Sequence, residues 1–321
     1  MRINFPGLII LRLLIAFSIL YFIYSKFPLS DALNVLSYAN LSLIGICTIL
    51  PFIMYTFASY RLWQLTSNQG IKLSYLKIIE INLATTFYGL FLPGGNMAGG
   101  AVRVYKISGE DKRVVETLAS IALDRIVATL ALCIVGVFFW TVHRPNNSGF
   151  IGLIMLIGIF VIVFLQVVVF SNSFPHRLKL SFLNNLSFIT SRIQKLYKTL
   201  NNYRNLSVRT FIFILVISII SQLVGIVAYY LLALSIGIDI SYTAIGWVRS
   251  AVILTTMIPI SISGLGLREG ALLFLLQSYA VSTDETLAFS ILIYLVTILM
   301  VGILGGLIEV IRFLIPVKDQ I

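Results

Sequence analysis

Long apolar runs separated by short polar stretches dominate this chain. A helix that crosses a bilayer needs roughly 20 apolar residues, and six runs come close to that length or exceed it. We therefore predict an all-α, multi-pass membrane helix bundle with six full spans. The predicted spans are about Leu8–Tyr24, Leu41–Tyr60, Val115–Trp140, Phe150–Phe170, Phe211–Ile236 and Leu287–Leu314.

Two further apolar runs, Ile78–Leu92 and Ala244–Ile262, lead into glycine-rich breaks. Each break follows a Thr-Thr pair, ends in Gly-x-x-x-Arg, and is followed by a shorter apolar piece, Ala101–Ile107 or Ala271–Val281. Irregular backbone at membrane depth is tolerated only where protein or a water-filled cavity satisfies its polar groups. We therefore predict two re-entrant hairpins, with non-helical tips at Pro93 to Gly100 and Ser263 to Gly266.

The basic residues set the orientation. With a cytoplasmic N-terminus, 18 of the 23 Lys and Arg residues flank the cytoplasmic ends of spans, as the positive-inside rule requires. Basic residues flank the first broken segment, whereas the second lies between Asp239 and Asp284, where they are scarce. The two hairpins should thus enter from opposite sides, which makes an inverted-topology repeat. The single membrane domain, 1–321, divides into halves at 1–140 and 150–315, with both termini cytoplasmic in the cell membrane.

Between the halves, residues 171–209 form a basic cytoplasmic linker. Its apolar residues recur near helical spacing with basic residues between them, which predicts a helix lying on anionic inner-leaflet lipids. An ordinary cytoplasmic helix packed under the bundle is the alternative.

Composition agrees with a membrane protein. Hydrophobic residues make up 59% of the chain and charged residues 11%, against about 25% charged in soluble domains. The net charge of +11 could suggest a nucleic-acid partner, but the basic residues lie between spans, where anionic lipid explains them. Neither His143 nor His176 has a partner at metal-ligand spacing, so no metal or other cofactor is expected.

The glycine-rich breaks also supply the candidate site. A guanidinium binds phosphate through two parallel hydrogen bonds, and nearby glycines let backbone N–H groups approach a ligand. We predict that two phosphate sites, one opening to each leaflet, contain Arg103, Arg268, Glu269, Gly94, Gly95, Asn96, Gly264 and Gly266. Alternatively, Arg103 is a positive-inside anchor and Arg268 a structural partner of Glu269.

Three further charged residues are expected to balance the charge at the phosphate sites. Asp124 and Arg125 lie about ten residues into a predicted span, where ionisable groups are costly and usually functional. Glu80 precedes the first break and could carry a proton. We predict that Arg125 pairs with Glu80 or Glu269, and Asp124 with Arg103 or Arg268; a purely structural ion network is the alternative.

Three stretches resemble the lysylphosphatidylglycerol synthase transmembrane-region family of flippase-like proteins. They are Leu92–Arg103, Ser120–Arg125 and Pro259–Gly270. The resemblance implies a multi-pass protein and, for some members, movement of aminoacylated or prenyl-linked lipids. Where many members have Gly-Glu-x-x-Arg, this chain has Gly99-Gly100-Ala101-Val102-Arg103 without an acid. The 321 residues hold no large cytosolic aminoacyl-transfer domain, so synthase activity is not expected.

Taken together, these features favour a flippase-like transporter over an enzyme. Its substrate would be a phospholipid or a prenyl-phosphate-linked lipid, moved between leaflets without ATP, since no nucleotide motif is present. A membrane enzyme on lipid-linked substrates and an accessory subunit of a cell-envelope enzyme are the alternatives. The sequence is also compatible with a homo-oligomer.

Overall fold

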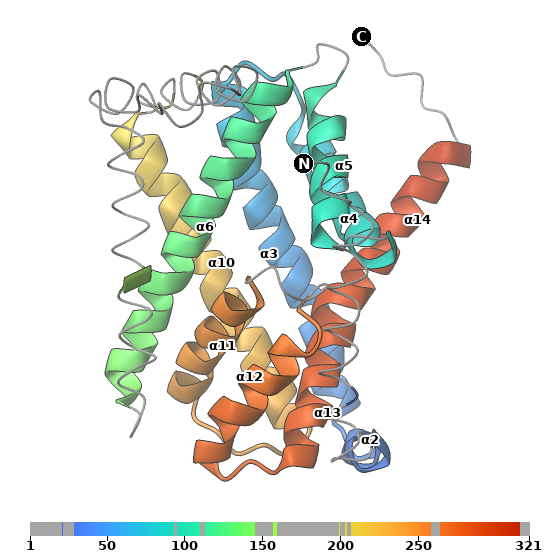
Figure 1. The fold of residues 1–321 in the computed structure, drawn as a ribbon, viewed down its shortest axis with the longest axis vertical. Coiled ribbons are helices and arrows are strands. Elements are labelled where there is room, and N and C mark those ends of the chain that lie inside the picture. Colours follow the sequence, from blue (N-terminus) through green and yellow to red (C-terminus); the bar gives the residue numbers. More distant parts are fainter. Residues whose placement is uncertain are drawn as a thin grey trace, which may run out of the picture.

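A computed structural model shows a bundle of helices (Figure 1). It describes residues 21, 29–92, 95–109, 113–144, 157–158, 199, 203, 207–257 and 264–314. Four helices in these ranges are long and apolar enough to cross a membrane. They are α3 (Leu41–Asn68), α6 (Val114–His143), α10 (Val208–Ser235) and the continuous helix Thr283–Leu314, which comprises α13 (Thr283–Tyr294), a π-helical turn (Leu295–Leu299) and α14 (Met300–Leu314).

These four helices confirm four of the six predicted spans. The other two, Leu8–Tyr24 and Phe150–Phe170, lie almost wholly outside the described residues, as does most of the 171–209 linker. From that linker, the buried side chain of Tyr203 shares a 2.7 Å hydrogen bond with Ser120 of α6 and donates one to the carbonyl of Leu65 on α3 (2.9 Å). This part of the linker therefore packs against the bundle.

Polar caps explain where several helices begin. A cap side chain accepts hydrogen bonds from backbone N–H groups that have no partner within the helix. Asn40 does this for α3, Ser74 for α4 (Tyr75–Phe91) and Ser241 for α11 (Tyr242–Thr256). At α13, Ser282 and Glu285 form a reciprocal capping box. A short helix, α2 (Leu29–Ser37), packs against α13.

Two pairs of shorter helices flank the glycine-rich breaks, with one helix before and one after each break. Helix α4 packs against α5 (Asn96–Ser108), and α11 packs against α12 (Leu267–Leu276). In Figure 1 the α4–α5 pair lies in the upper half of the bundle and the α11–α12 pair in the lower half. Each pair returns to the end where it started, because α3 ends and α6 begins beside the first pair, and α10 ends and α13 begins beside the second.

The expected non-helical tips need correction. We predicted irregular backbone from Pro93 to Gly100, but α5 already begins at Asn96. Gly95 precedes it with φ of 57°, a left-handed conformation that favours glycine. At the second break Gly264 and Gly266 have φ of 77° and 80° in the turn before α12. The first irregular segment is therefore shorter than its glycine content suggested, whereas the described part of the second, Gly264 to Gly266, is non-helical as predicted.

Glycines also allow helices to approach closely. A Cβ at Gly305 would overlap the backbone of Leu83, and one at Gly306 would press on the ring of Phe87. This brings α14 against α4 through a seam of small residues, the usual device of packed membrane helices. Gly99 likewise brings α5 onto α4, because a Cβ there would lie 2.5 Å from the carbonyl oxygen of Thr85.

Candidate functional site

The larger of two neighbouring cavities lies beside the first short helix pair. It has a volume of about 470 Å³, and both Arg103 of α5 and Arg125 of α6 line it. The other polar lining residues are Tyr55, Thr85 and Thr86. Arg103 is only 9% exposed, its Nε has no hydrogen-bond partner, and no carboxylate in the described part of the chain pairs with it. The cavity therefore carries two positive charges without a neutralising acid on its wall.

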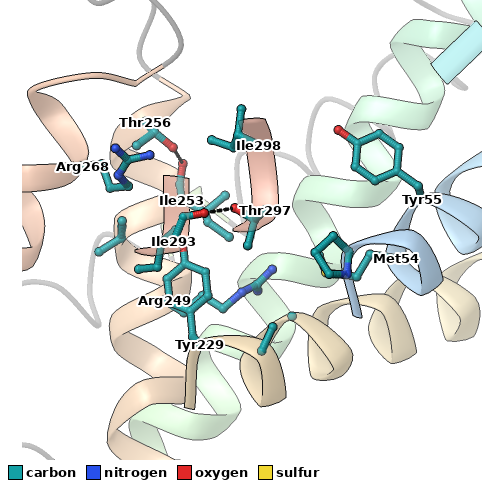
Figure 2. Close-up of a pocket in the computed structure, with 14 residues that line it drawn as sticks. Met54, Tyr55, Tyr229, Arg249, Ile253, Thr256, Arg268, Ile293, Thr297 and Ile298 are labelled. Carbon is teal, nitrogen blue, oxygen red and sulfur yellow. Dashed lines mark hydrogen bonds between the residues drawn. The ribbon is translucent and has the colours of Figure 1, made fainter. Parts of the chain in front are cut away.

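The second cavity lies between α3, α10, α11, α12 and the π-helical turn. Its volume is about 220 Å³, and Arg249, Arg268, Thr256 and Thr297 are polar residues of its wall. Figure 2 shows the Arg249 guanidinium pointing toward the space between α11 and Met54, while the hydroxyl of Thr297 donates to the carbonyl of Ile293 (2.7 Å). A π-helical turn widens a helix locally and often marks a functional position. Here it places Thr297 on the cavity wall.

Two residues, Tyr55 and Ile298, line both cavities. The hydroxyl groups of Tyr55 and Thr86 share a hydrogen bond of 2.8 Å, which fixes the phenol ring at the boundary. Thr86 belongs to the first Thr-Thr pair and lines the larger cavity, while Thr256 belongs to the second pair and lines the smaller one. Each Thr-Thr pair therefore contributes to the wall of one cavity.

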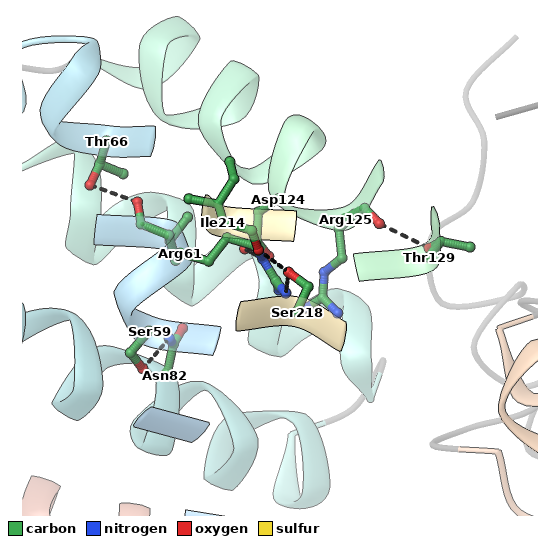
Figure 3. Close-up of polar contacts among 10 residues, drawn as sticks. Ser59, Arg61, Thr66, Asn82, Asp124, Arg125, Thr129, Ile214 and Ser218 are labelled. Carbon is green, nitrogen blue, oxygen red and sulfur yellow. Dashed lines mark hydrogen bonds and ion pairs between the residues drawn. The ribbon is translucent and has the colours of Figure 1, made fainter. Parts of the chain in front are cut away.

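A buried ion pair holds α3, α6 and α10 together beside the larger cavity. Arg61 donates from Nε to Asp124 (2.6 Å) and from Nη1 to the hydroxyl of Ser218 (2.9 Å), as Figure 3 shows. Arg61 and Asp124 are 5% and 4% exposed. The prediction that Asp124 pairs with Arg103 or Arg268 is therefore wrong, because Arg61 occupies the carboxylate.

A second buried ion pair forms at the start of α12. Arg268 donates to Glu269 (2.5 Å) and to the hydroxyl of Ser290 (2.9 Å), and the guanidinium lies 5.2 Å from the ring centroid of Tyr294. The other carboxylate oxygen of Glu269 accepts the backbone N–H of Gly266 (2.7 Å). Glu269 thus occupies the partly positive N-terminus of α12, which would otherwise attract an anionic ligand.

The two glycine-rich breaks therefore differ in charge. At the second break the protein supplies its own carboxylate to Arg268, as the structural alternative for that residue expected. At the first break, where the sequence has no acid beside Arg103, none is supplied by the described residues either. Among the described residues Arg103 thus has no direct ion-pair partner, only a longer-range attraction to Asp124, which Arg61 already holds, while Arg268 is neutralised by Glu269.

A family model described as the lysylphosphatidylglycerol synthase TM region matches residues 9–305. The chain belongs to this family. No curated protein matches the chain. The match covers both breaks, three of the four long helices and most of the fourth, so the resemblance carried by Leu92–Arg103, Ser120–Arg125 and Pro259–Gly270 is confirmed.

The remaining predicted charges do not form the ion pairs that the sequence suggested. Glu80 pairs with Arg312 of α14, not with Arg125. Glu309 of α14 binds Lys106 (2.5 Å) and accepts a hydrogen bond from Tyr88 (3.0 Å). Since Glu269 is held by Arg268, both predicted partners of Arg125 are occupied. The prediction of a buried Arg125 pair is wrong, and Arg125 is exposed on the wall of the larger cavity.

The described candidate glycines lie in the turns before α5 and α12 and are not among the residues that line the two cavities. Gly95 precedes α5, while Gly264 and Gly266 form the turn before α12. Gly94 and the side chain of Asn96 lie outside the described residues. The described part of the chain contains no group of three His, Cys, Asp or Glu side chains that could hold a metal ion.

Sequence reasoning missed Arg61 and Arg249. Arg61 was counted among the cytoplasmic anchors because it ends an apolar run, but it is buried against Asp124. Arg249 lies inside the apolar run Ala244–Ile262. Ionisable residues inside a membrane segment are usually functional, as was argued for Asp124. The same argument applied to the sequence would have identified Arg249 as a candidate site residue.

Proposed function

We propose that this protein is a membrane transporter that moves a phosphate-bearing lipid head group between leaflets. Arg103 carries the proposal. It is a buried guanidinium without a carboxylate partner among the described residues, on the wall of a cavity of about 470 Å³. A buried charge is retained at a cost in stability unless it is compensated, and a guanidinium fork matches the oxygen geometry of phosphate as well as carboxylate groups.

In this proposal the two short helix pairs are re-entrant hairpins in an inverted repeat. Their return to opposite ends of the bundle supports it, as does the distribution of basic residues along the chain. The basic face would lie in the cytoplasm, with both termini there, in the cell membrane. Anionic inner-leaflet lipids would hold that face.

The lipid tail would stay in the bilayer while the head group enters the cavity. The lining favours this division, because Leu90, Met97 and Ile121 stand beside the polar residues. An ion or proton gradient, or the lipid gradient itself, would drive movement. We place no catalytic residue, because no acid–base pair faces the larger cavity among its described lining residues.

Reconstitution in liposomes tests the proposal. Fluorescent phosphatidylglycerol in both leaflets is exposed to an external quencher that cannot cross the bilayer, with and without a proton gradient. The wild type should raise the accessible fraction above that in protein-free liposomes, and Arg103→Gln should abolish the gain. The matched control is Arg209→Gln, an exposed arginine at the start of α10, which should transport normally.

A fluorescent lipid with a neutral sugar head group gives the specificity arm. Phosphate recognition predicts little or no movement of that lipid. Equal movement of both lipids, or full transport by Arg103→Gln, would overturn the proposal.

A further inference from the structure

The smaller cavity contains a second cation for which the described residues provide no anion. Arg249 of α11 is 2% exposed. Its Nη1 donates to the side-chain carbonyl of Gln222 (2.9 Å), and its guanidinium lies 5.3 Å from the ring centroid of Tyr229. Its Nε has no partner, and no carboxylate among the described residues pairs with it. Both contacts are with neutral groups.

Two other buried arginines, unlike Arg103, are neutralised within the protein. Arg61 and Arg268 each meet a carboxylate, at 2.6 and 2.5 Å. A carbonyl oxygen and a ring face compensate a buried charge only in part. Arg249 is therefore an exception that a purely structural role explains poorly and an incoming anion explains well.

The backbone of α10 leaves space for this guanidinium. A Cβ added at Gly225 would overlap Nη2 of Arg249, so the side chain lies directly on the helix surface. Figure 2 shows the guanidinium directed along the cavity toward Met54, away from Arg268 and Thr256. Gly225 and Gln222 together hold the cation in place on the cavity wall.

We propose that Arg249 forms a second phosphate subsite, across Tyr55 from the subsite of Arg103. The proposal rests on the function proposed above and extends it, because it gives the head group one binding place in each half of the molecule. The cavity of about 220 Å³ is below the roughly 300–1,000 Å³ of pockets for drug-sized ligands. It suits a phosphate group and not the lipid tails.

Tyr55 is the boundary between the two subsites. It lines both cavities and is tied to Thr86 by one hydrogen bond. A head group that passes from Arg103 to Arg249 must displace this ring. Arg268, whose charge Glu269 neutralises, forms the far wall of the second subsite and is not its anion ligand.

Protection of a single cysteine tests the second subsite separately from the first. The buried cysteines Cys47 and Cys133 are replaced by Ala. One reporter, Thr297→Cys, lies in the smaller cavity, and the other, Thr86→Cys, lies in the larger one. The rate of alkylation by a small maleimide is measured in detergent against rising dihexanoyl phosphatidylglycerol and, in a parallel arm, inorganic phosphate.

We expect the lipid to protect both cysteines. Adding Arg249→Met should raise the concentration for half-protection at position 297 by about tenfold or more, since charge-assisted hydrogen bonds are lost, and leave position 86 unchanged. Gly225→Ala keeps the charge but displaces the guanidinium, so it should weaken protection at 297 as well. Arg209→Gln, the exposed control, should alter neither value. Protection by inorganic phosphate would assign the subsite to the phosphate group alone, and protection by the lipid only would assign it to the whole head group.

The outcomes separate the two proposals. Unchanged protection at 297 in Arg249→Met, or protection at 86 alone, overturns the second subsite and leaves the transport proposal standing. Absence of protection at both positions overturns both. Melting curves without lipid give a further check, because Arg249→Met removes an uncompensated buried charge and should melt at or above the wild-type temperature. A clear loss of stability in that variant would show that Arg249 is a structural residue.

Discussion

The buried pair of Arg61 and Asp124 gives the sharpest test of the packing. Replacing Arg61 with Met removes the cation and leaves the Asp124 carboxylate, 4% exposed, without its ion-pair partner. Breaking a buried pair in this way costs about 3–5 kcal/mol. At about 2–4 °C for each kcal/mol in a domain of 150–250 residues, the apparent melting temperature should fall by roughly 6–20 °C.

The double variant separates loss of the pair from loss of packing. Arg61→Met combined with Asp124→Leu replaces both charges by apolar groups, a change that is often neutral or stabilising. It should therefore recover most of the lost stability. The assay is thermal melting in detergent, followed by the fraction that stays monodisperse after heating.

A matched control uses the pair of Arg312 and Glu80, whose side chains are 39% and 34% exposed. Such pairs contribute about 0–1 kcal/mol, so Arg312→Gln should shift the melting curve little. If Arg61→Met melts like the wild type, or if the double variant is less stable than both single variants, the ion pair does not hold these helices together.

Three further predictions follow from the same contacts. Arg125→Leu should leave the melting temperature in detergent unchanged or higher, because Arg125 lies on a cavity wall without an acid partner among the described residues; a large loss of stability would reveal a partner. Gly305→Leu should lower the melting temperature, because the new side chain would overlap the backbone of α4. Gly45→Ala, which has open space at its Cβ, should leave the melting temperature unchanged. Equal melting temperatures of the two variants would contradict the close packing of α14 on α4. In a background without native cysteines, Lys72→Cys and Ser278→Cys, both exposed, should react with an impermeant maleimide from opposite sides of the membrane; labelling from one side would contradict the inverted repeat.

Local sequence patterns identified the described helices well. Apolar length predicted α3, α6, α10 and the long C-terminal helix, because crossing a bilayer imposes a length that any sequence must meet. The glycine breaks separated α4 from α5 and α11 from α12. The exact limits of the irregular segments were less clear, since Gly99 and Gly100 lie within α5 and not in an irregular tip. Gly99 there allows α5 to pack closely on α4.

The charge pairings could not be read from the sequence. Arg61 and Asp124 are 63 positions apart and meet only because α3 packs against α6. The same holds for Lys106 and Glu309, and for Glu80 and Arg312. Adjacent residues were the exception: the alternative that paired Arg268 with Glu269 needed only local geometry, and the structure contains that pair.

Blocking the larger cavity tests the central claim most directly. Thr86→Cys, in a background without the two native cysteines, is reconstituted in liposomes and modified to completion with a bulky maleimide. Ser278→Cys, exposed and outside both cavities, is modified in parallel. A head group that passes through the cavity predicts that movement of fluorescent phosphatidylglycerol stops in the modified Thr86→Cys protein and continues in the modified Ser278→Cys protein. Full transport by completely modified Thr86→Cys would contradict passage of the lipid head group through this cavity.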